Sequence, residues 1–201
     1  MRVAGGCDFA KRTLDAANLP IPWTMTALPA VVPLTLASTE FDLSRTHPVK
    51  FQPHWTVART DDELQLLCNG STFRVHTLGE LDGRTVCAVL PLDALFEARV
   101  KSVRRLWLAA NGRNSGPDPS ALSKTQRDRL VKGLRALDGR LEGATYREIA
   151  ASVLRTHRVP DHGWKTHDLR DRTIRLCKSA VNLMQGDYRQ LLVHPYRQRL
   201  Y

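Results

Sequence analysis

The side chains best suited to chemistry are the basic and amide groups that recur along residues 166–184. Arg172, Arg175 and Lys178 are three residues apart, and Asn182 follows four residues later. At about 100° per residue of an α-helix, this spacing places them on one half of the helix. Arg and Lys can bind guanine edges or phosphates in a major groove, and Asn can bind adenine. The pattern predicts DNA recognition, and the alternative is a solvated face of an ordinary amphipathic helix.

We expect the binding residues to lie in this helix and just before it. The DNA- or partner-binding residues predicted in this way are Lys165, Thr166, His167, Arg170, Arg172, Arg175, Lys178, Ser179 and Asn182. The other half of the same helix is apolar and should face a core: Leu169, Thr173, Ile174, Leu176, Cys177, Ala180, Val181, Leu183 and Met184. A half-buried helix of this kind leaves its polar side free for a ligand.

Groups that could support catalysis or hold a metal are scattered. The chain has no Gly-rich phosphate loop, no G-x-S-x-G and no H-E-x-x-H. The four cysteines are isolated, without the C-x-x-C spacing of a zinc site. Arg170, His194 and Tyr201 could be compared with the residues of a tyrosine recombinase, but the chain is short for such an enzyme. We therefore expect no enzyme activity, no metal and no cofactor.

The positive charge is concentrated in the last 81 residues. Residues 1–120 hold 13 Lys and Arg against 12 Asp and Glu, whereas residues 121–201 hold 17 against 8. A folded basic surface attracts polyanions through counterion release, and nucleic acid is the commonest such partner. No apolar run reaches the roughly 20 residues that span a bilayer. These features predict a cytoplasmic protein whose main partner is double-stranded DNA, with no membrane association.

Three helices are expected after a polar linker at residues 111–120. Ser123-Lys-Thr-Gln126 and Thr145-Tyr-Arg-Glu148 are capping boxes that begin the first two helices. The third helix runs from about residue 166 to residue 184. The side chains predicted to face inward from the first two helices are Leu130, Val131, Leu134, Leu137, Leu141, Ile149, Ala150 and Val153.

The first 110 residues are expected to form a small antiparallel β module. Asn69-Gly70 predicts a type I′ turn between strands 63–68 and 72–77. Further strands are predicted at 31–36, 55–59 and 84–90. In the hairpin, the expected cross-strand pairs are Cys68 with Ser71, Leu66 with Phe73 and Leu64 with Val75.

A helix should cover this module between Asp93, as its cap, and Ala110. Its apolar side is predicted from a helical repeat to be Phe96, Val100, Val103 and Trp107. The expected fold class is therefore α+β, in which a small antiparallel β module with a covering helix precedes an all-α, three-helix, helix-turn-helix-like module. The predicted boundaries are 1–110 for the β module, 111–120 for the linker and 121–201 for the helical module.

The helical region also resembles a known family. Gly143-Ala-Thr-Tyr-Arg-Glu-Ile-Ala150, Leu169-Arg-Asp-Arg-Thr-Ile-Arg175 and Tyr188-Arg-Gln-Leu-Leu192 are similar to the proteobacterial family catalogued as domain of unknown function 2285. That resemblance implies a variant helix-turn-helix regulator that controls excision or transfer of a conjugative element. The members look like transcriptional activators, or like anti-activators that bind such activators.

The length of the connection before the third helix leaves a second function possible. About eleven residues, 155–165, separate the second and third helices, whereas an ordinary helix-turn-helix uses three or four. We expect Trp164 to fill the core at this junction. The long connection could direct the third helix toward a protein, so the alternative function is a module that holds another helix-turn-helix regulator without contacting DNA. A homodimer is also compatible with the sequence.

Overall fold

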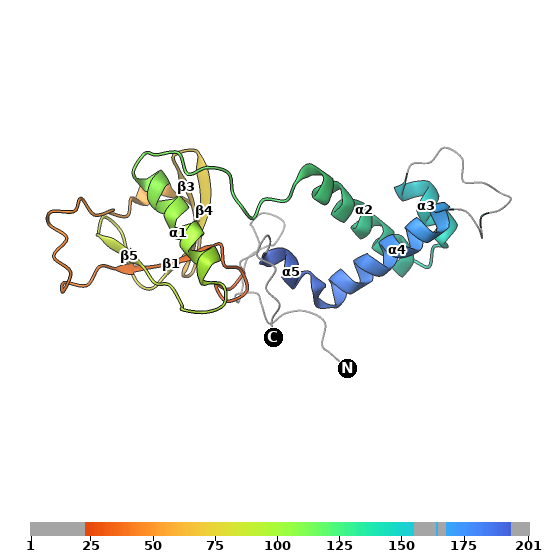
Figure 1. The fold of residues 1–201 in the computed structure, drawn as a ribbon, viewed down its shortest axis with the longest axis horizontal. Helices are drawn as coiled ribbons and strands as arrows, with labels where there is room; N and C mark the ends of the chain where they lie inside the picture. Colours follow the sequence, from red (N-terminus) through yellow and green to blue (C-terminus); the bar gives the residue numbers. More distant parts are fainter. Residues whose placement is uncertain (1–22, 155–163, 165–167, 194–201) are drawn as a thin grey trace. The chain divides into compact units, whose positions relative to one another are not determined.

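The computed structural model describes residues 23–154, 164 and 168–193, and the chain divides into two compact units (Figure 1). One unit is built on a β-sheet and holds the described residues up to Ser120 together with residues 190–193, and the other holds the helices between Ala121 and Arg189. A strand-rich unit followed by a helical one confirms the predicted α+β class. No helix within these described ranges is both long and apolar enough to cross a bilayer.

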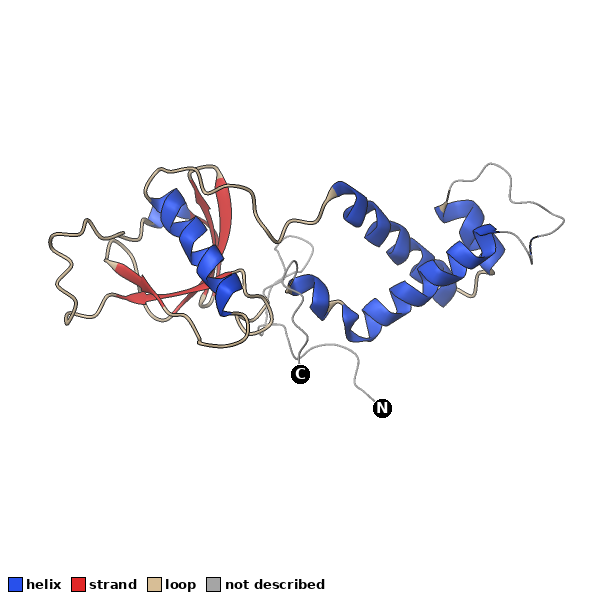
Figure 2. Cartoon of the chain, viewed as in Figure 1, coloured by secondary structure: helices blue, strands red, loops and turns tan. Residues whose placement is uncertain are grey.

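The β unit contains a five-stranded mixed sheet (Figure 2). Its spatial order is β2-β3-β4-β1-β5. The strands are β1 (Val31–Leu36), β2 (Thr56–Thr60), β3 (Glu63–Cys68), β4 (Ser71–Thr77) and β5 (Val86–Ala88), and a short 3-10 helix, η1 (Pro53–Trp55), precedes β2.

The hairpin between β3 and β4 has the predicted turn and register. Asn69 and Gly70 both have positive φ angles, 46° and 74°, as a type I′ turn requires. The three expected pairs, Cys68 with Ser71, Leu66 with Phe73 and Leu64 with Val75, are all present. The local turn chemistry therefore determined the register correctly.

The placement of β1 differs from the expected antiparallel meander. β1 lies between β4 and β5, pairing in parallel with β4 and antiparallel with β5. Val31, Val32 and Leu34 are all buried, so both faces of this strand are covered. A near-continuous apolar run is typical of a central strand, which explains why β1 occupies an interior position and separates β5 from the hairpin.

The predicted face of the covering helix was only partly correct. Helix α1 (Phe96–Ala110) packs Val103 against the core of the sheet as predicted, but it also packs Leu106 and Ala109 there, and Trp107 is 48% exposed, so the contact side is rotated from the predicted one. Asp93 does not cap the helix with its side chain in the expected way: the N-cap residue is Leu95, whose N–H donates to Asp93 Oδ1 at 2.9 Å.

A buried arginine accounts for this rotation of α1. Arg99 is 3% exposed, and its guanidinium donates to Asp93 Oδ2 at 3.1 Å and to the Met25 carbonyl at 2.8 Å. A buried guanidinium is tolerable when its donors are paired in this way. Hydrophobic periodicity assigns every arginine to the surface, so it cannot identify a helix that buries one.

Residues 111–120, expected as a linker, bind the β unit at several points. Asn69 Nδ2 donates to the Arg113 carbonyl at 3.1 Å, and the hydroxyls of Ser71 and Ser115 are 2.8 Å apart. Arg105 lies 3.9 Å from Asp118. The turn of the hairpin thus anchors the segment that follows α1.

The helical unit contains three main helices and two short elements. The first four are α2 (Lys124–Leu141), α3 (Tyr146–Val153), α4 (Asp168–Asn182) and the π-helical turn η3 (Leu183–Asp187). The short helix α5 (Arg189–Leu192) begins at the last residue of this unit, and its other residues group with the β unit. Ser123 with Gln126 and Thr145 with Glu148 form both predicted capping boxes. The predicted third helix ends as an α-helix at Asn182, two residues early, and Gly186 in η3 has a φ of 133°.

The apolar stripe predicted for α2 was only partly correct. Leu137 is buried, but Val131, Leu134 and Leu141 are 41%, 61% and 68% exposed. The buried positions between α2 and its neighbours include Gly133 and Ala136, which are small. Small residues allow helix backbones to approach closely, so the contact side of α2 is the one with the least side-chain bulk and not the one richest in leucine.

The core of the helical unit forms where α2, α3 and α4 meet. Its buried residues are Ala136, Ile149, Val153 and Cys177, with Ala144, Tyr146 and Leu176 packed around them. Ala150 is fully buried, as predicted, and Arg140 lies over the Tyr146 ring at 4.9 Å. The three helices therefore share one small core that sets the position of α4.

Candidate nucleic-acid interface

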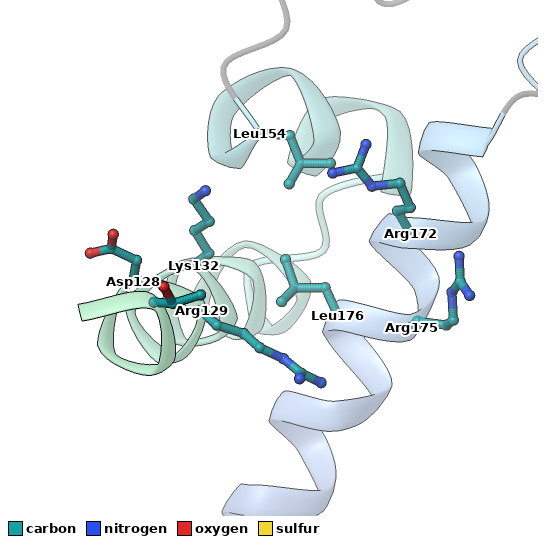
Figure 3. Close-up of a pocket in the computed structure, with 8 residues that line it drawn as sticks. Asp128, Arg129, Lys132, Leu154, Arg172, Arg175 and Leu176 are labelled. Carbon is teal, nitrogen blue, oxygen red and sulfur yellow. The ribbon is translucent and has the colours of Figure 1, made fainter. Parts of the chain in front are cut away.

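A basic cleft of about 590 Å³ opens between α2 and α4, beside the end of α3 (Figure 3). Its lining residues are Thr125, Asp128, Arg129, Lys132, Leu154, Arg172, Arg175 and Leu176. All of them belong to the helical unit. Four cations and one carboxylate line this cleft, which gives it a net charge of +3 when all are ionised.

The two long helices bring these cations together. Arg129 and Lys132 are three residues apart on α2, and Arg172 and Arg175 are three residues apart on α4. Residues three apart lie on neighbouring positions of one helix side, so each helix contributes a pair of cations to the same cleft. The packing of Gly133 against Ala180 and Leu176 lets α2 and α4 approach each other here.

Apolar side chains form part of the cleft wall. Leu176 extends from α4 into the space between the two helices, and the guanidinium of Arg172 reaches toward Leu154 at the end of α3 (Figure 3). Aliphatic surface beside an arginine supports the stem of the side chain while its charged end stays accessible. The cations are thereby held at the mouth of a partly apolar cleft.

The two arginines that α4 contributes to the cleft are weakly engaged within the protein. Arg172 lies 3.8 Å from Asp168, with both side chains more than half exposed. Arg175 donates from Nε to the Asp171 carbonyl at 3.3 Å. Exposed pairs of this kind contribute little, so the guanidinium groups can exchange these contacts for phosphate oxygens.

The buried side of α4 holds the helix in place. Thr173 is fully buried, and its hydroxyl donates to the Leu169 carbonyl at 2.7 Å. Cys177 is also buried, with Sγ 3.9 Å from the Ala136 carbonyl. Burial raises the pKa of the Cys177 thiol, with the nearby Arg140 charge opposing that rise, so this residue is a packing group in the neutral form.

The structure separates the predicted site residues into three groups. Arg172 and Arg175 line the cleft, whereas Lys178 and Asn182 are exposed on α4 outside its lining. Ser179 and Arg170 also lie outside the lining; Ser179 is half-buried, and Arg170 pairs with Asp171 at 3.6 Å. Lys165, Thr166 and His167 lie outside the described residues, as does the connection at 155–163. Trp164, expected to fill the core near this connection, is half-buried.

The residues predicted from the sequence did not include the part of the cleft formed by α2. Arg129 and Lys132 line the cleft, but they lie outside the predicted third helix, and all of the predicted binding residues lie in that helix or just before it. The sequence feature that could have indicated them is their spacing, since two cations at i and i+3 lie on one side of a helix, here a helix whose buried side carries small residues. This spacing shows which side of α2 is basic, but only the packing of α4 against α2 makes that side the border of a cleft. Among the residues that the structure describes, no group of three or more His, Cys, Asp and Glu side chains could hold a metal ion.

A three-helix core with capped helices and a cleft of cations is typical of nucleic-acid-binding modules. The family comparison agrees with this class. Residues 89–193, more than half of the chain, match the family described as a T6SS transcription factor, DNA-binding domain. The chain belongs to this family of DNA-binding transcription-factor domains. No curated protein matches the chain significantly.

This match corrects the family expected from the sequence. The family that covers the helical residues carries a T6SS transcription-factor description, and not that of the conjugative-element regulators catalogued as domain of unknown function 2285. The expected control of excision or transfer genes rested on that resemblance alone and is not retained. The motif residues around Ala150 indicate a helix-turn-helix-like packing, which is shared too widely to identify a biological context.

Proposed function

We propose that the chain regulates transcription by binding duplex DNA in the basic cleft between α2 and α4. The observation that carries this proposal is the convergence of Arg129, Lys132, Arg172 and Arg175 from two helices on one cleft, within a domain of a DNA-binding family. Cations from two elements can bind successive phosphates along a backbone, which positions the protein on the duplex. The variant helix-turn-helix then places the exposed side of α4 next to the DNA.

The family description also suggests which promoters to test. The family is described as a T6SS transcription factor, so genes for a type VI secretion system are the proposed targets. Phosphate contacts alone cannot distinguish these promoters from other DNA. The polar residues of α4 outside the cleft, Lys178 and Asn182 among them, supply groups that can read base edges.

Binding to duplex DNA at several salt concentrations tests the proposal. Labelled promoter fragments of type VI secretion genes are titrated with the full chain, against an excess of random duplex. Four phosphate contacts give a slope of roughly −4 in log K against log salt. We expect one promoter fragment to outcompete random duplex at near-physiological salt.

A matched pair of charge reversals locates the binding surface. Arg175→Glu should weaken binding by roughly 1–3 kcal/mol or more, because it places a carboxylate in the cleft. Arg45→Glu, an exposed position in the β unit, makes the same change in net charge and should have a much smaller effect. Equal loss in both variants would show that only the overall charge matters.

The alternative function is capture of another regulator through the same helices, without DNA contact. The long connection between α3 and α4 is the feature that favours it. Protein binding dominated by apolar burial depends weakly on salt. Absence of any preferred duplex, together with a salt-insensitive complex with a second helix-turn-helix protein, would replace the DNA proposal with this one.

A further inference from the structure

Helix α2 has a second exposed side that the proposed DNA site does not use. Val131, Leu134 and Leu141 are 41%, 61% and 68% exposed, although they are among the most apolar residues of the helix. They lie on the other side of α2 from Arg129 and Lys132, which line the cleft. We call the row formed by Lys124, Arg127, Val131, Leu134, Asp138 and Leu141 the α2 seam.

The spacing of the seam is that of a coiled coil. Its residues follow one another at intervals of three, four, three, four and three. Alternating intervals of three and four make the a and d positions of a heptad repeat, which is the pattern that pairs two helices side by side. All six side chains are exposed, so the seam is accessible along the whole of α2.

The charges of the seam are arranged for an antiparallel partner of the same sequence. Arg127 and Asp138 are equally distant from the midpoint of the helix between Lys132 and Gly133, about 8 Å on either side. Val131 and Leu134 are symmetric about the same midpoint. A two-fold axis through this point would place Arg127 against Asp138 of a second copy, and Val131 against Leu134.

Parallel pairing of the seam is disfavoured by the same charges. It would bring Arg127 against Arg127 and Asp138 against Asp138, and like charges at close range oppose association. Polar residues at a and d positions commonly determine helix orientation and register in this way.

We propose that the α2 seam is a homodimer interface, in which two copies of this chain pair α2 antiparallel about a two-fold axis. One helix pair is small compared with standard protein–protein interfaces, so the dimer forms in the micromolar range. The cleft lies on another side of α2 and stays open in the dimer. This inference does not depend on DNA binding.

Sedimentation of the full chain over a micromolar concentration series, without DNA, tests the proposal. We expect a reversible monomer–dimer equilibrium that Leu134→Asp weakens by more than roughly tenfold. Leu92→Asp is the matched control, since Leu92 is 89% exposed and lies in the β unit. A wild-type chain that remains monomeric throughout the series would overturn the proposal.

Charge reversal tests the antiparallel register. Arg127→Asp and Asp138→Arg should each weaken self-association, because each creates like-charged contacts across the axis. The two variants mixed together should form a heterodimer, since both contacts then join opposite charges, and the double variant should dimerise again. Both positions are exposed, and circular dichroism checks that the helices are intact. A mixture that dimerises no better than either variant alone would refute this register.

Discussion

Gly139 of α2 lies so close to Ile149 of α3 that a Cβ on the glycine would be 3.3 Å from Ile149 Cγ1. Ile149 is 2% exposed and surrounded by the core, so it has little freedom to move away. Gly133 differs, because a Cβ there would make an ordinary contact with Ala180 Cβ at 3.7 Å. The close approach of α2 and α3 therefore leaves little room for a side chain at Gly139, whereas the contact of α2 with α4 accommodates an alanine at Gly133.

Alanine should stabilise the protein at one of the two glycines and not at the other. Gly133→Ala is expected to raise the free energy of unfolding by about 0.5–1 kcal/mol, because alanine restricts the unfolded chain and favours the helix. Gly139→Ala should give no gain, and Gly139→Val should cost about 1–3 kcal/mol through overpacking. Urea unfolding followed by helical circular dichroism measures all three. Similar gains for alanine at both positions would show that Ile149 can adjust.

Ala150 tests the packing of α3. Ala150→Arg would bury a charge and overfill a fully buried position, so the helical unit should lose its cooperative thermal transition. Ala151→Arg is the control, because the next residue along the helix is exposed. A cooperative melt of the Ala150→Arg protein at the wild-type temperature would mean that α3 faces another way.

The contribution of α2 to DNA binding can be separated from that of the outer side of α4. Arg129→Gln should weaken binding to a promoter duplex by roughly 1 kcal/mol or more and reduce the salt slope by about one. Lys178→Gln removes the same charge from α4 outside the cleft, at a position proposed to read base edges, so it should reduce the preference for the promoter over random duplex. Fluorescence anisotropy with both duplexes at two salt concentrations compares the two variants. A larger loss of affinity for random duplex with Lys178→Gln than with Arg129→Gln would move the main phosphate-contact surface out of the cleft.

The ion pair of Asp93 with Arg99 predicts a pH-dependent stability of the β unit. The hydrogen bond from Arg99 holds the pKa of Asp93 below its ordinary value of 3.8, and burial opposes that effect. A carboxyl whose pKa is lowered by folding stabilises the fold above the ordinary value and loses this contribution as the pH falls below it. Asp93→Asn should therefore lower the free energy of unfolding at neutral pH, by about 1–3 kcal/mol, since the buried Arg99 loses one partner.

Urea denaturation of wild type and Asp93→Asn at several pH values measures this difference. It should be largest at neutral pH and shrink in acid. The contribution will lie toward the lower end of that range, because the Asp93 side chain is 43% exposed. A difference that stays constant from neutral pH to well below 3.8 would exclude the ion pair as its source.

Local signals were sufficient for much of the fold. Asn69-Gly70 determined the hairpin and its register, because few turns accept two residues of positive φ. Ser123 and Thr145 located the starts of α2 and α3, because a capping side chain satisfies helix N–H groups within three residues of itself. Each of these signals is complete within a short segment.

Hydrophobic patterns were less reliable where partners are distant in sequence. A prediction from hydrophobicity alone would expose Arg99 and bury Leu134, whereas the structure buries the arginine and exposes the leucine. Arg99 can be buried because Asp93 and the Met25 carbonyl bind it, and no periodicity in α1 contains that information. Leu134 is exposed because α3 and α4 pack against the side of α2 that holds small residues.

The sequence by itself determined the class of the protein, an α+β chain with a basic helical region, and it singled out two arginines of α4 that line the basic cleft. Only the tertiary structure decided which other residues join them. Arg129 and Arg175 are 46 positions apart, and they line one cleft because Gly133 and Ala180 let two helices pack closely. Helical periodicity determines the side of a helix on which a residue lies. The neighbour that this side contacts depends on packing between segments that are distant in sequence, and a local sequence pattern does not contain that information.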